Sequence, residues 1–209
     1  MFGPKYKEQK FNVLLTLDGY AVKQLGRQTR ASITLKGKMD SQIANAFRLL
    51  TEYILGASRM RITGQEKGTE AGNTAPAASS PAKGNQKMPM TVPIAIQQQG
   101  QMEKASTIMS FVLPNTFKDA KEVPVPTDER IQIEVVPSRD MAVISCSKNF
   151  TEERFWKKVE YLRHIAARDS IQLSTDPNDV ELWIYNSPWT LPWLKKNEVA
   201  IRVVDVMGA

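Results

Sequence analysis

The sequence offers a single cysteine and a single histidine for chemistry, Cys146 and His164. One cysteine excludes a disulfide within the chain and any zinc or iron–sulfur site built from several cysteines. One histidine excludes an HExxH metal motif, and the cysteine and histidine do not form the CxxCH motif of covalent haem attachment. Residue types alone therefore exclude most metal and nucleophile chemistries.

Acid–base catalysis needs carboxylates with raised pKa values in a closed site. We nominate two acids, Glu134 and Glu198, and Glu134 falls on the polar side of an alternating strand. Residues 188–196 contain two tryptophans, two leucines and two prolines. Aromatic side chains in such a loop either close the end of a barrel or line a ligand site. We therefore expect a binding protein rather than an enzyme and assign no catalytic or metal-binding residue.

The chain has 209 residues, a net charge of +6, and an ordinary globular composition with 42% hydrophobic residues. Three of the six excess positive charges lie in residues 59–87, which are rich in Gly, Ala, Ser and Pro and which we expect to form a flexible inserted loop. The remainder is mildly basic, so we expect no nucleic-acid partner. Without an apolar span or signal core, we expect a cytoplasmic monomer with no membrane partner.

Alternating apolar residues predict strands at 20–25 and 31–35 in the first half of the chain. Asp40 is predicted to cap the helix that follows, and Gly56 to end it in a left-handed turn. The predicted buried stripe of this helix is Ile43, Phe47, Leu50 and Ile54. Residues 11–17 predict an edge strand that leads through an Asp-Gly turn into the first of these strands.

The same pattern returns about 111 residues later, with predicted strands at 131–135 and 142–146 and Thr151 as helix cap. The stripe of the second helix is Phe155, Val159, Leu162 and Ala166. Each helix is followed by two more predicted strands, at 90–96 and 107–113 in the first half and at 180–186 and 198–204 in the second. We infer one domain over residues 1–209, built from two ββαββ repeats at about 19–113 and 130–204.

Two such units related by a pseudo-twofold axis bury their helical stripes on antiparallel strands. The seam between them predicts a groove, and a concave site of this kind takes an apolar ligand.

The sequence resembles the SOUL haem-binding protein family in several segments. Residues 19–25 (GYAVKQL) look like the opening strand, and residues 46–56 (AFRLLTEYILG) look like the first helix. Residues 87–94 (KMPMTVPI) are similar to the family's Lys-x-x-Met-Thr-x-Pro-Val segment, the most specific match. Two short motifs, YNSP at 185–188 and KNEV at 196–199, resemble the last motif pair of the family.

The resemblance implies an α+β fold, a distorted antiparallel β-barrel with two helices, related to the small-molecule-binding domains of some bacterial transcription regulators. It also implies reversible, noncovalent binding of haem, free porphyrin or another tetrapyrrole in a shallow apolar groove beside the first helix and the loop before the last strand.

A porphyrin needs apolar walls and a cation for its propionates. At about 100° per residue, one flank of the first helix carries Ala44, Arg48, Thr51 and Leu55. The loop before the last strand supplies Trp189, Leu191, Trp193 and Lys195. We predict that these eight residues bind the tetrapyrrole, with Arg48 available to pair with a propionate. Glu52, beside this flank, is expected to repel propionates.

We expect no strong axial ligand for iron. His164 lies about 200° from the buried stripe of its helix, so we predict a surface histidine. Cys146 falls on the apolar side of its strand and is predicted to be a buried structural thiol. Four methionines could offer thioethers, but methionine more often fills a core: Met60, Met88, Met90 and Met102. Haem and metal-free porphyrin are therefore expected to bind with similar, modest affinity.

A different binding role is the principal alternative. Glu198, if buried in a pocket, would select a small cationic ligand. Residues 162–169 have the loose pattern of a segment that binds a partner protein, although we expect their apolar residues to serve the core.

Overall fold

Two helices, α1 (Met39–Ile54) and α2 (Glu152–Arg168), interrupt a run of strands along the chain. The computed structural model describes residues 7–56, 58–59, 87–100, 104–117, 119–147, 151–186 and 195–206. The strands before α2 are β1 (Lys7–Glu8), β2 (Asn12–Leu17), β3 (Tyr20–Leu25), β4 (Gln28–Lys36), β5 (Ser58–Arg59), β6 (Thr91–Val92), β7 (Ile94–Gln99), β8 (Ser106–Val112), β9 (Val125–Pro126), β10 (Ile131–Val136) and β11 (Arg139–Ser147). Those after it are β12 (Ile171–Leu173), β13 (Val180–Ile184) and β14 (Lys196–Val206). Two short 3-10 helices are η2 (Ala120–Glu122) and η3 (Pro177–Asp179).

The main sheet has ten strands in the order β10-β4-β8-β7-β13-β14-β11-β3-β2, with β12 paired to β14. The order from β10 to β3 has an internal symmetry. Each strand from the first half of the chain has a counterpart in the second half: β3 and β10, β4 and β11, β7 and β13, β8 and β14. When the two members of every pair are exchanged, the same order results, read from the other end. Two related ββαββ halves would produce this symmetry, with the first strand of each half joining the sheet of the other. The predicted edge strand, β2, lies at one end.

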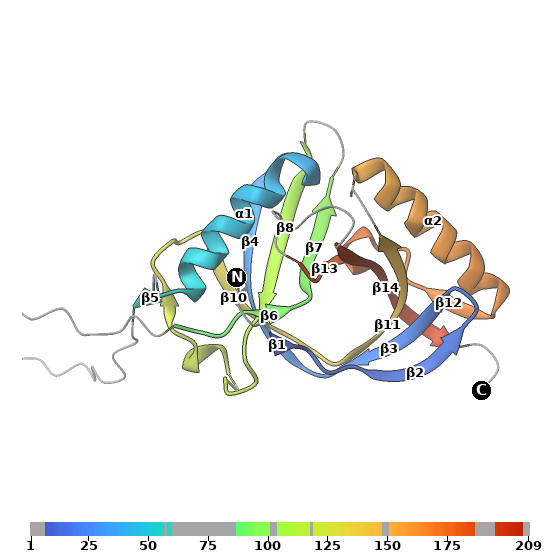
Figure 1. Cartoon of the computed structure of the whole chain (residues 1–209), viewed down its shortest axis with the longest axis horizontal. Helices are drawn as coiled ribbons and strands as arrows, with labels where there is room; N and C mark the ends of the chain where they lie inside the picture. Colours follow the sequence, from blue (N-terminus) through green and yellow to red (C-terminus); the bar gives the residue numbers. More distant parts are fainter. Residues whose placement is uncertain are drawn as a thin grey trace, which may run out of the picture.

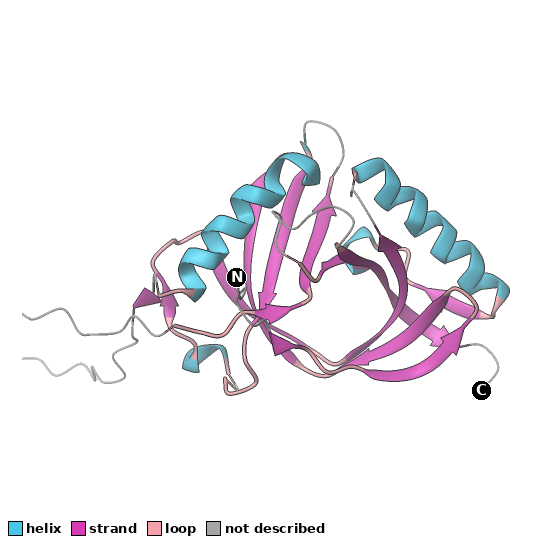
Figure 2. Cartoon of the chain, viewed as in Figure 1, coloured by secondary structure: helices cyan, strands magenta, loops and turns pink. Residues whose placement is uncertain are grey.

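The sheet is antiparallel throughout and open, because β10 and β2 are edges that do not pair with each other. Figure 1 shows it curled beneath the two helices, which lie on the same side. The expected α+β architecture is thus confirmed in the form of a curled half-barrel with two helices (Figure 2).

The main core lies between the helices and the sheet. The helical period predicted the helix residues of this core well. The predicted stripe of α2 is fully buried, and in the predicted stripe of α1 only Ile43 remains partly exposed. A smaller cluster covers the opposite, helix-free face of the sheet: Leu25, Val92, Ala95, Met141, Val143, Trp183, Tyr185 and Ala200. Phe11 packs against that cluster from the segment between β1 and β2. Neither described helix is long and apolar enough to cross a membrane.

The prediction that Asp40 caps α1 is wrong. The helix begins earlier, with Lys38 in the cap position, so Asp40 already lies in its first turn. Its carboxylate instead accepts from the backbone nitrogen of Glu152, the first residue of α2, at 3.1 and 3.3 Å. Asp40 therefore satisfies a free N–H group of the other helix, where the helix dipole favours a negative charge. Thr151 caps α2 as predicted, accepting from the backbone nitrogen of Arg154.

Two further differences concern strands. Pro93 divides the strand predicted over 90–96 into β6 and β7, because proline has no N–H group to donate to a neighbouring strand. Strand β12 follows α2 directly and was not predicted. The loop predicted over 59–87 lies outside the described residues except at its two ends.

Candidate functional site

The predicted flank of α1 faces solvent. Ala44, Arg48 and Leu55 are exposed, Leu55 by 58%, and Thr51 is half-buried. The hydroxyl oxygen of Thr51 is itself buried and has no hydrogen-bond partner among the described residues. This flank lines none of the three pockets that we describe on the molecule.

Arg48 has two side-chain partners on the surface of α1. Its Nη1 lies 2.6 Å from Oε1 of Glu52, one helical turn along, and Nη2 donates to the side-chain oxygen of Asn45 at 3.3 Å. Both ionic side chains are more than half exposed, so the pair is screened by water and contributes little to folding. An incoming anion would therefore compete with Glu52 for the guanidinium.

Three of the predicted ligand-binding residues, Trp189, Leu191 and Trp193, lie outside the described residues. Lys195, the fourth member of that loop, is half-buried directly before β14. How the loop is placed against α1 thus stays a prediction.

Glu198 is buried on the helix-free face, but it already has a cation. Nζ of Lys23 lies 3.0 and 2.9 Å from its two carboxylate oxygens. Tyr185 donates its hydroxyl to Oε2 at 2.6 Å, and burial together with this hydrogen bond raises the pKa of Tyr185. The carboxylate that a cationic ligand would need is thus neutralised internally.

Aromatic rings complete the surroundings of that lysine. Its ammonium lies 5.4 Å from the ring centre of Phe11 and 5.9 Å from that of Trp183, within the range of cation–π attraction. The two rings are stacked, with centroids 5.4 Å apart and planes 9° from parallel. Lys23 thus links Glu198 to the stacked rings of Phe11 and Trp183, and the cationic partner of Glu198 comes from the protein's own side chains.

A second buried carboxylate, Glu181, lies on the same face and holds two arginines. Oε1 accepts from Arg30 at 2.9 Å and from Arg139 at 3.0 Å, and Oε2 accepts from the indole N–H of Trp183 at 2.7 Å. Burial alone would raise the pKa of Glu181, but the two guanidinium groups outweigh it and lower the pKa to about 2. The side chain is therefore ionised and structural at neutral pH, which does not suit a general acid or base.

Among the other reactive residues, the expectation is confirmed for His164 and in part for Cys146 and the methionines. His164 is exposed on α2. Cys146 is partly buried and packs against the main core, and burial raises its pKa to about 11. Met88 is buried in that core and Met90 packs against it, whereas Met60 and Met102 are not described.

Two further expectations, for Glu134 and for residues 162–169, are also confirmed. Glu134 lies exposed on β10, accepting a hydrogen bond from Ser32. The apolar residues of the segment at 162–169 that serve the core are Leu162, Ile165 and Ala166.

Sequence reasoning missed Lys23, Arg30, Arg139 and Glu181. Each occupies the polar position of an alternating strand, a position that ordinarily faces water. No local signal distinguishes them, because the N-terminal segment and the curl of the sheet are what cover that face.

Comparison with known proteins supplies a family and a fold. The model of the family described as "SOUL heme-binding protein" matches residues 6–202. Among solved structures, the C-terminal domain of EcmrR has a TM-score of 0.58 at 11% identity, covering 90% of this chain and 98% of that chain. A hydrolase from Listeria innocua has a TM-score of 0.55 at 11% identity, covering 97% and 94% respectively. Such low identities show the fold alone. No curated protein sequence matches the chain.

Proposed function

The chain belongs to the SOUL haem-binding protein family, and from this premise we propose that it binds haem or another tetrapyrrole reversibly and noncovalently on the exposed flank of α1. The observation that carries the proposal is the pairing of an exposed apolar residue with a cation on that flank. Leu55 is 58% exposed, and Arg48 lies seven residues earlier. Two helical turns separate them by about 10 Å, which is the width of a porphyrin.

In this proposal the macrocycle lies over Ala44, Thr51 and Leu55, and a propionate pairs with Arg48. The indoles and leucine of the loop at 189–193, with Lys195, form the other wall. In this proposal iron takes no strong protein ligand, because the one histidine lies on α2 and the one cysteine packs against the core. Bound haem would therefore contribute its own redox and ligand chemistry, while the protein supplies an apolar surface and a counter-charge.

The experiment is a titration of the full chain with haemin and with metal-free protoporphyrin, followed by absorbance and tryptophan quenching. We expect saturable binding of both ligands with dissociation constants within about tenfold of each other, since hydrophobic and propionate contacts are common to both. Absence of saturable binding of either ligand overturns the proposal. A low-spin haem spectrum that disappears in His164→Ala overturns the absence of a histidine ligand.

Two variants locate the site. Arg48→Gln removes the propionate partner and is expected to weaken binding about two- to fivefold, as for an exposed ion pair. Glu52→Gln releases Arg48 and removes a repulsive charge, so it is expected to strengthen binding by a similar factor. The matched control is Glu153→Gln, which breaks the equally spaced pair with Lys157 on α2 and is expected to change nothing. Equal affinities in all three variants would place the ligand elsewhere.

The cationic-ligand alternative is less well supported, because Lys23 already neutralises Glu198.

A further inference from the structure

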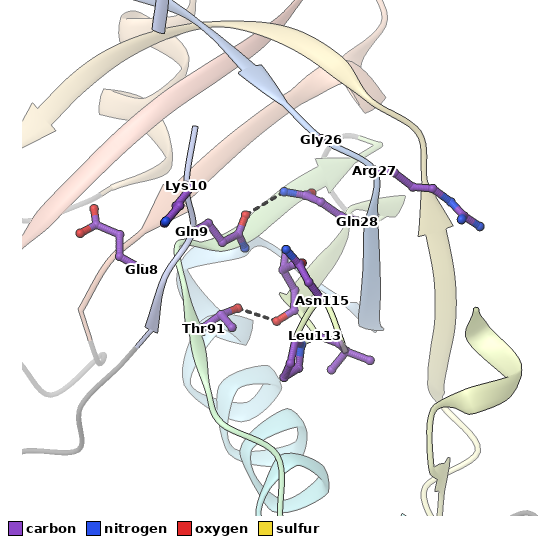
Figure 3. A pocket seen from close by; sticks show the side chains of 11 residues that line it. Glu8, Gln9, Lys10, Gly26, Arg27, Gln28, Thr91, Leu113 and Asn115 are labelled. Atoms are coloured by element: carbon purple, nitrogen blue, oxygen red, sulfur yellow. Dashed lines mark hydrogen bonds between the residues drawn. The ribbon is translucent and has the colours of Figure 1, made fainter. Parts of the chain in front are cut away.

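A pocket of about 340 Å³ opens on the molecule beside the N-terminal segment. None of the residues that line it belongs to the predicted tetrapyrrole flank of α1. The segment after β1 forms one wall, the turn between β3 and β4 forms another, and the end of β8 closes it (Figure 3). A neighbouring hollow of about 230 Å³ shares four of its lining residues, including Arg27 and Leu113. The larger pocket has the size of a small-molecule site.

A chain of polar groups leads into this pocket from the buried carboxylate of Glu181. Arg30 contacts Glu181, and its Nη2 and Nε atoms donate to the side-chain oxygen of Gln28 at 2.9 and 3.1 Å. Because a guanidinium has donors and no acceptor, the amide oxygen of Gln28 must face Arg30. The amide nitrogen of Gln28 then points the other way and donates to Oε1 of Gln9 at 2.7 Å.

This chain fixes the orientation of the last amide. Since Oε1 of Gln9 accepts from Gln28, its Nε2 is turned away from Gln28, as Figure 3 shows. That nitrogen is buried and has no hydrogen-bond partner among the described residues. The nearby hydroxyl of Thr91 donates to the carbonyl of Val112. A buried N–H group without an acceptor is costly, and an acceptor from a ligand would satisfy it.

The charges around the pocket favour an anionic acceptor. Lys10 and Arg27 are exposed lining residues, and neither forms an ion pair with a described residue, although Figure 3 shows the guanidinium of Arg27 extending away from Gln9. Glu8 also lines the pocket, but Figure 3 shows its carboxylate directed away from Gln9, and it lies 3.7 Å from Nζ of Lys196. Leu113 and Pro114 add an apolar wall.

We propose that this pocket binds a small amphipathic monocarboxylate. The carboxylate accepts from Nε2 of Gln9 and is attracted by Lys10 and, at longer range, by Arg27, while its hydrocarbon part packs against Leu113 and Pro114. The buried Arg30 strengthens the outermost donor, because each hydrogen bond in the chain polarises the next. The site is independent of the tetrapyrrole function and uses none of its residues.

The test uses octanoate below its micelle-forming concentration, with octanol and octylammonium as probes of the same length. In calorimetric titration of the full chain, we expect saturable binding of octanoate and at least about tenfold weaker binding of the other two, since only the carboxylate gains a charge-assisted hydrogen bond. In ¹H–¹⁵N spectra, octanoate should shift the side-chain amide signal that is missing from a Gln9→Glu sample. No saturation, or equal binding of octanol, overturns the proposal.

Gln9→Glu is the decisive variant. The new carboxylate still accepts from Gln28, so the fold is retained, but an oxygen replaces the unpartnered N–H donor. We expect at least about tenfold weaker octanoate binding. Arg27→Gln is expected to weaken binding about threefold, and Lys36→Gln, an exposed lysine elsewhere on β4, should leave it unchanged. Unaltered binding in Gln9→Glu, or displacement of octanoate by haemin in competition, refutes a separate carboxylate site.

The two sites can fail separately. Arg48→Gln should change haemin binding and leave octanoate binding unchanged, while Gln9→Glu should do the reverse.

Discussion

The guanidinium of Arg30 and the carboxylate of Glu181 meet at two points, with Nη1–Oε1 at 2.9 Å and Nη2–Oε2 at 3.4 Å. Arg30 lies on β4 in the first half of the chain and Glu181 on β13 in the second, with β8 and β7 between them in the sheet. In a flat sheet those strands would be about 14 Å apart. The contact therefore depends on the curl of the sheet, and it joins the two halves across the helix-free face.

Loss of that carboxylate should be strongly destabilising. Glu181→Gln leaves Arg30 and Arg139 buried without a counter-charge, and we expect the free energy of unfolding to fall by about 3–5 kcal/mol. Urea unfolding followed by circular dichroism measures the change. Glu153→Gln, which breaks an exposed pair on α2, serves as the control and should have little effect. A similarly small effect of both substitutions would show that the buried cluster is not important for stability.

The same carboxylate should make stability depend on acid pH. The pKa of Glu181 is lowered from 4.5 to about 2 in the folded protein, so the unfolded chain takes up the proton first as the pH falls. Its contribution is complete above about pH 4.5 and is lost as the pH falls toward 2. The difference in unfolding free energy between wild type and Glu181→Gln should therefore shrink between pH 5 and pH 3. A constant difference across that range would contradict the lowered pKa.

Lys23 should be required mainly because Glu198 is buried. Lys23→Met leaves that carboxylate without its cation, and we expect a loss of about 3 kcal/mol. In the double variant Lys23→Met/Glu198→Gln the uncompensated charge is gone, so more than half of the loss should be recovered. Additive losses in the double variant, measured by the same urea unfolding, would mean that the two side chains act independently.

Cys146 should react slowly in the folded protein. Burial raises the pKa of its thiol from 9.0 to about 11, so at pH 8 the thiolate fraction is about a hundredfold lower than for an unperturbed thiol. Ellman's reagent should modify the native chain at least about a hundredfold more slowly than the chain in 8 M urea. Native and unfolded rates within a factor of ten would show that the thiol is accessible and unperturbed.

Local pattern was sufficient for both long helices, for most strands and for their buried faces. The stripe from Phe155 to Ala166 repeats with the helical period, and burial of one helix face is what produces such a repeat. The strands at 20–25 and 142–146 follow from alternation for the same reason. The cap of α1 was mispredicted, because Asp40 is a good capping residue for either helix. Which N-terminus it serves depends on where α2 begins in space.

The two candidate sites also differ in how far the sequence alone could predict them. The flank of α1 with Arg48 and Leu55 could be located from helical spacing, because residues on one helix have fixed directions. The pocket at Gln9 could not, since its walls come from segments up to about 100 residues apart and its chemistry depends on how an amide is oriented by Arg30.

Taken alone, the amino-acid order determined the family, through its motifs, and also the helices, most strands and their apolar faces, because the period of a helix or strand is a local property of the chain. Only the folded structure decided that Arg30 and Glu181 are buried and that Lys23 is partly buried, rather than solvated. In the sequence their polar positions predict a solvent-exposed sheet face. In the folded protein the sheet is curled and Phe11 packs on that face, and the burial of a charge depends on partners that are distant in sequence.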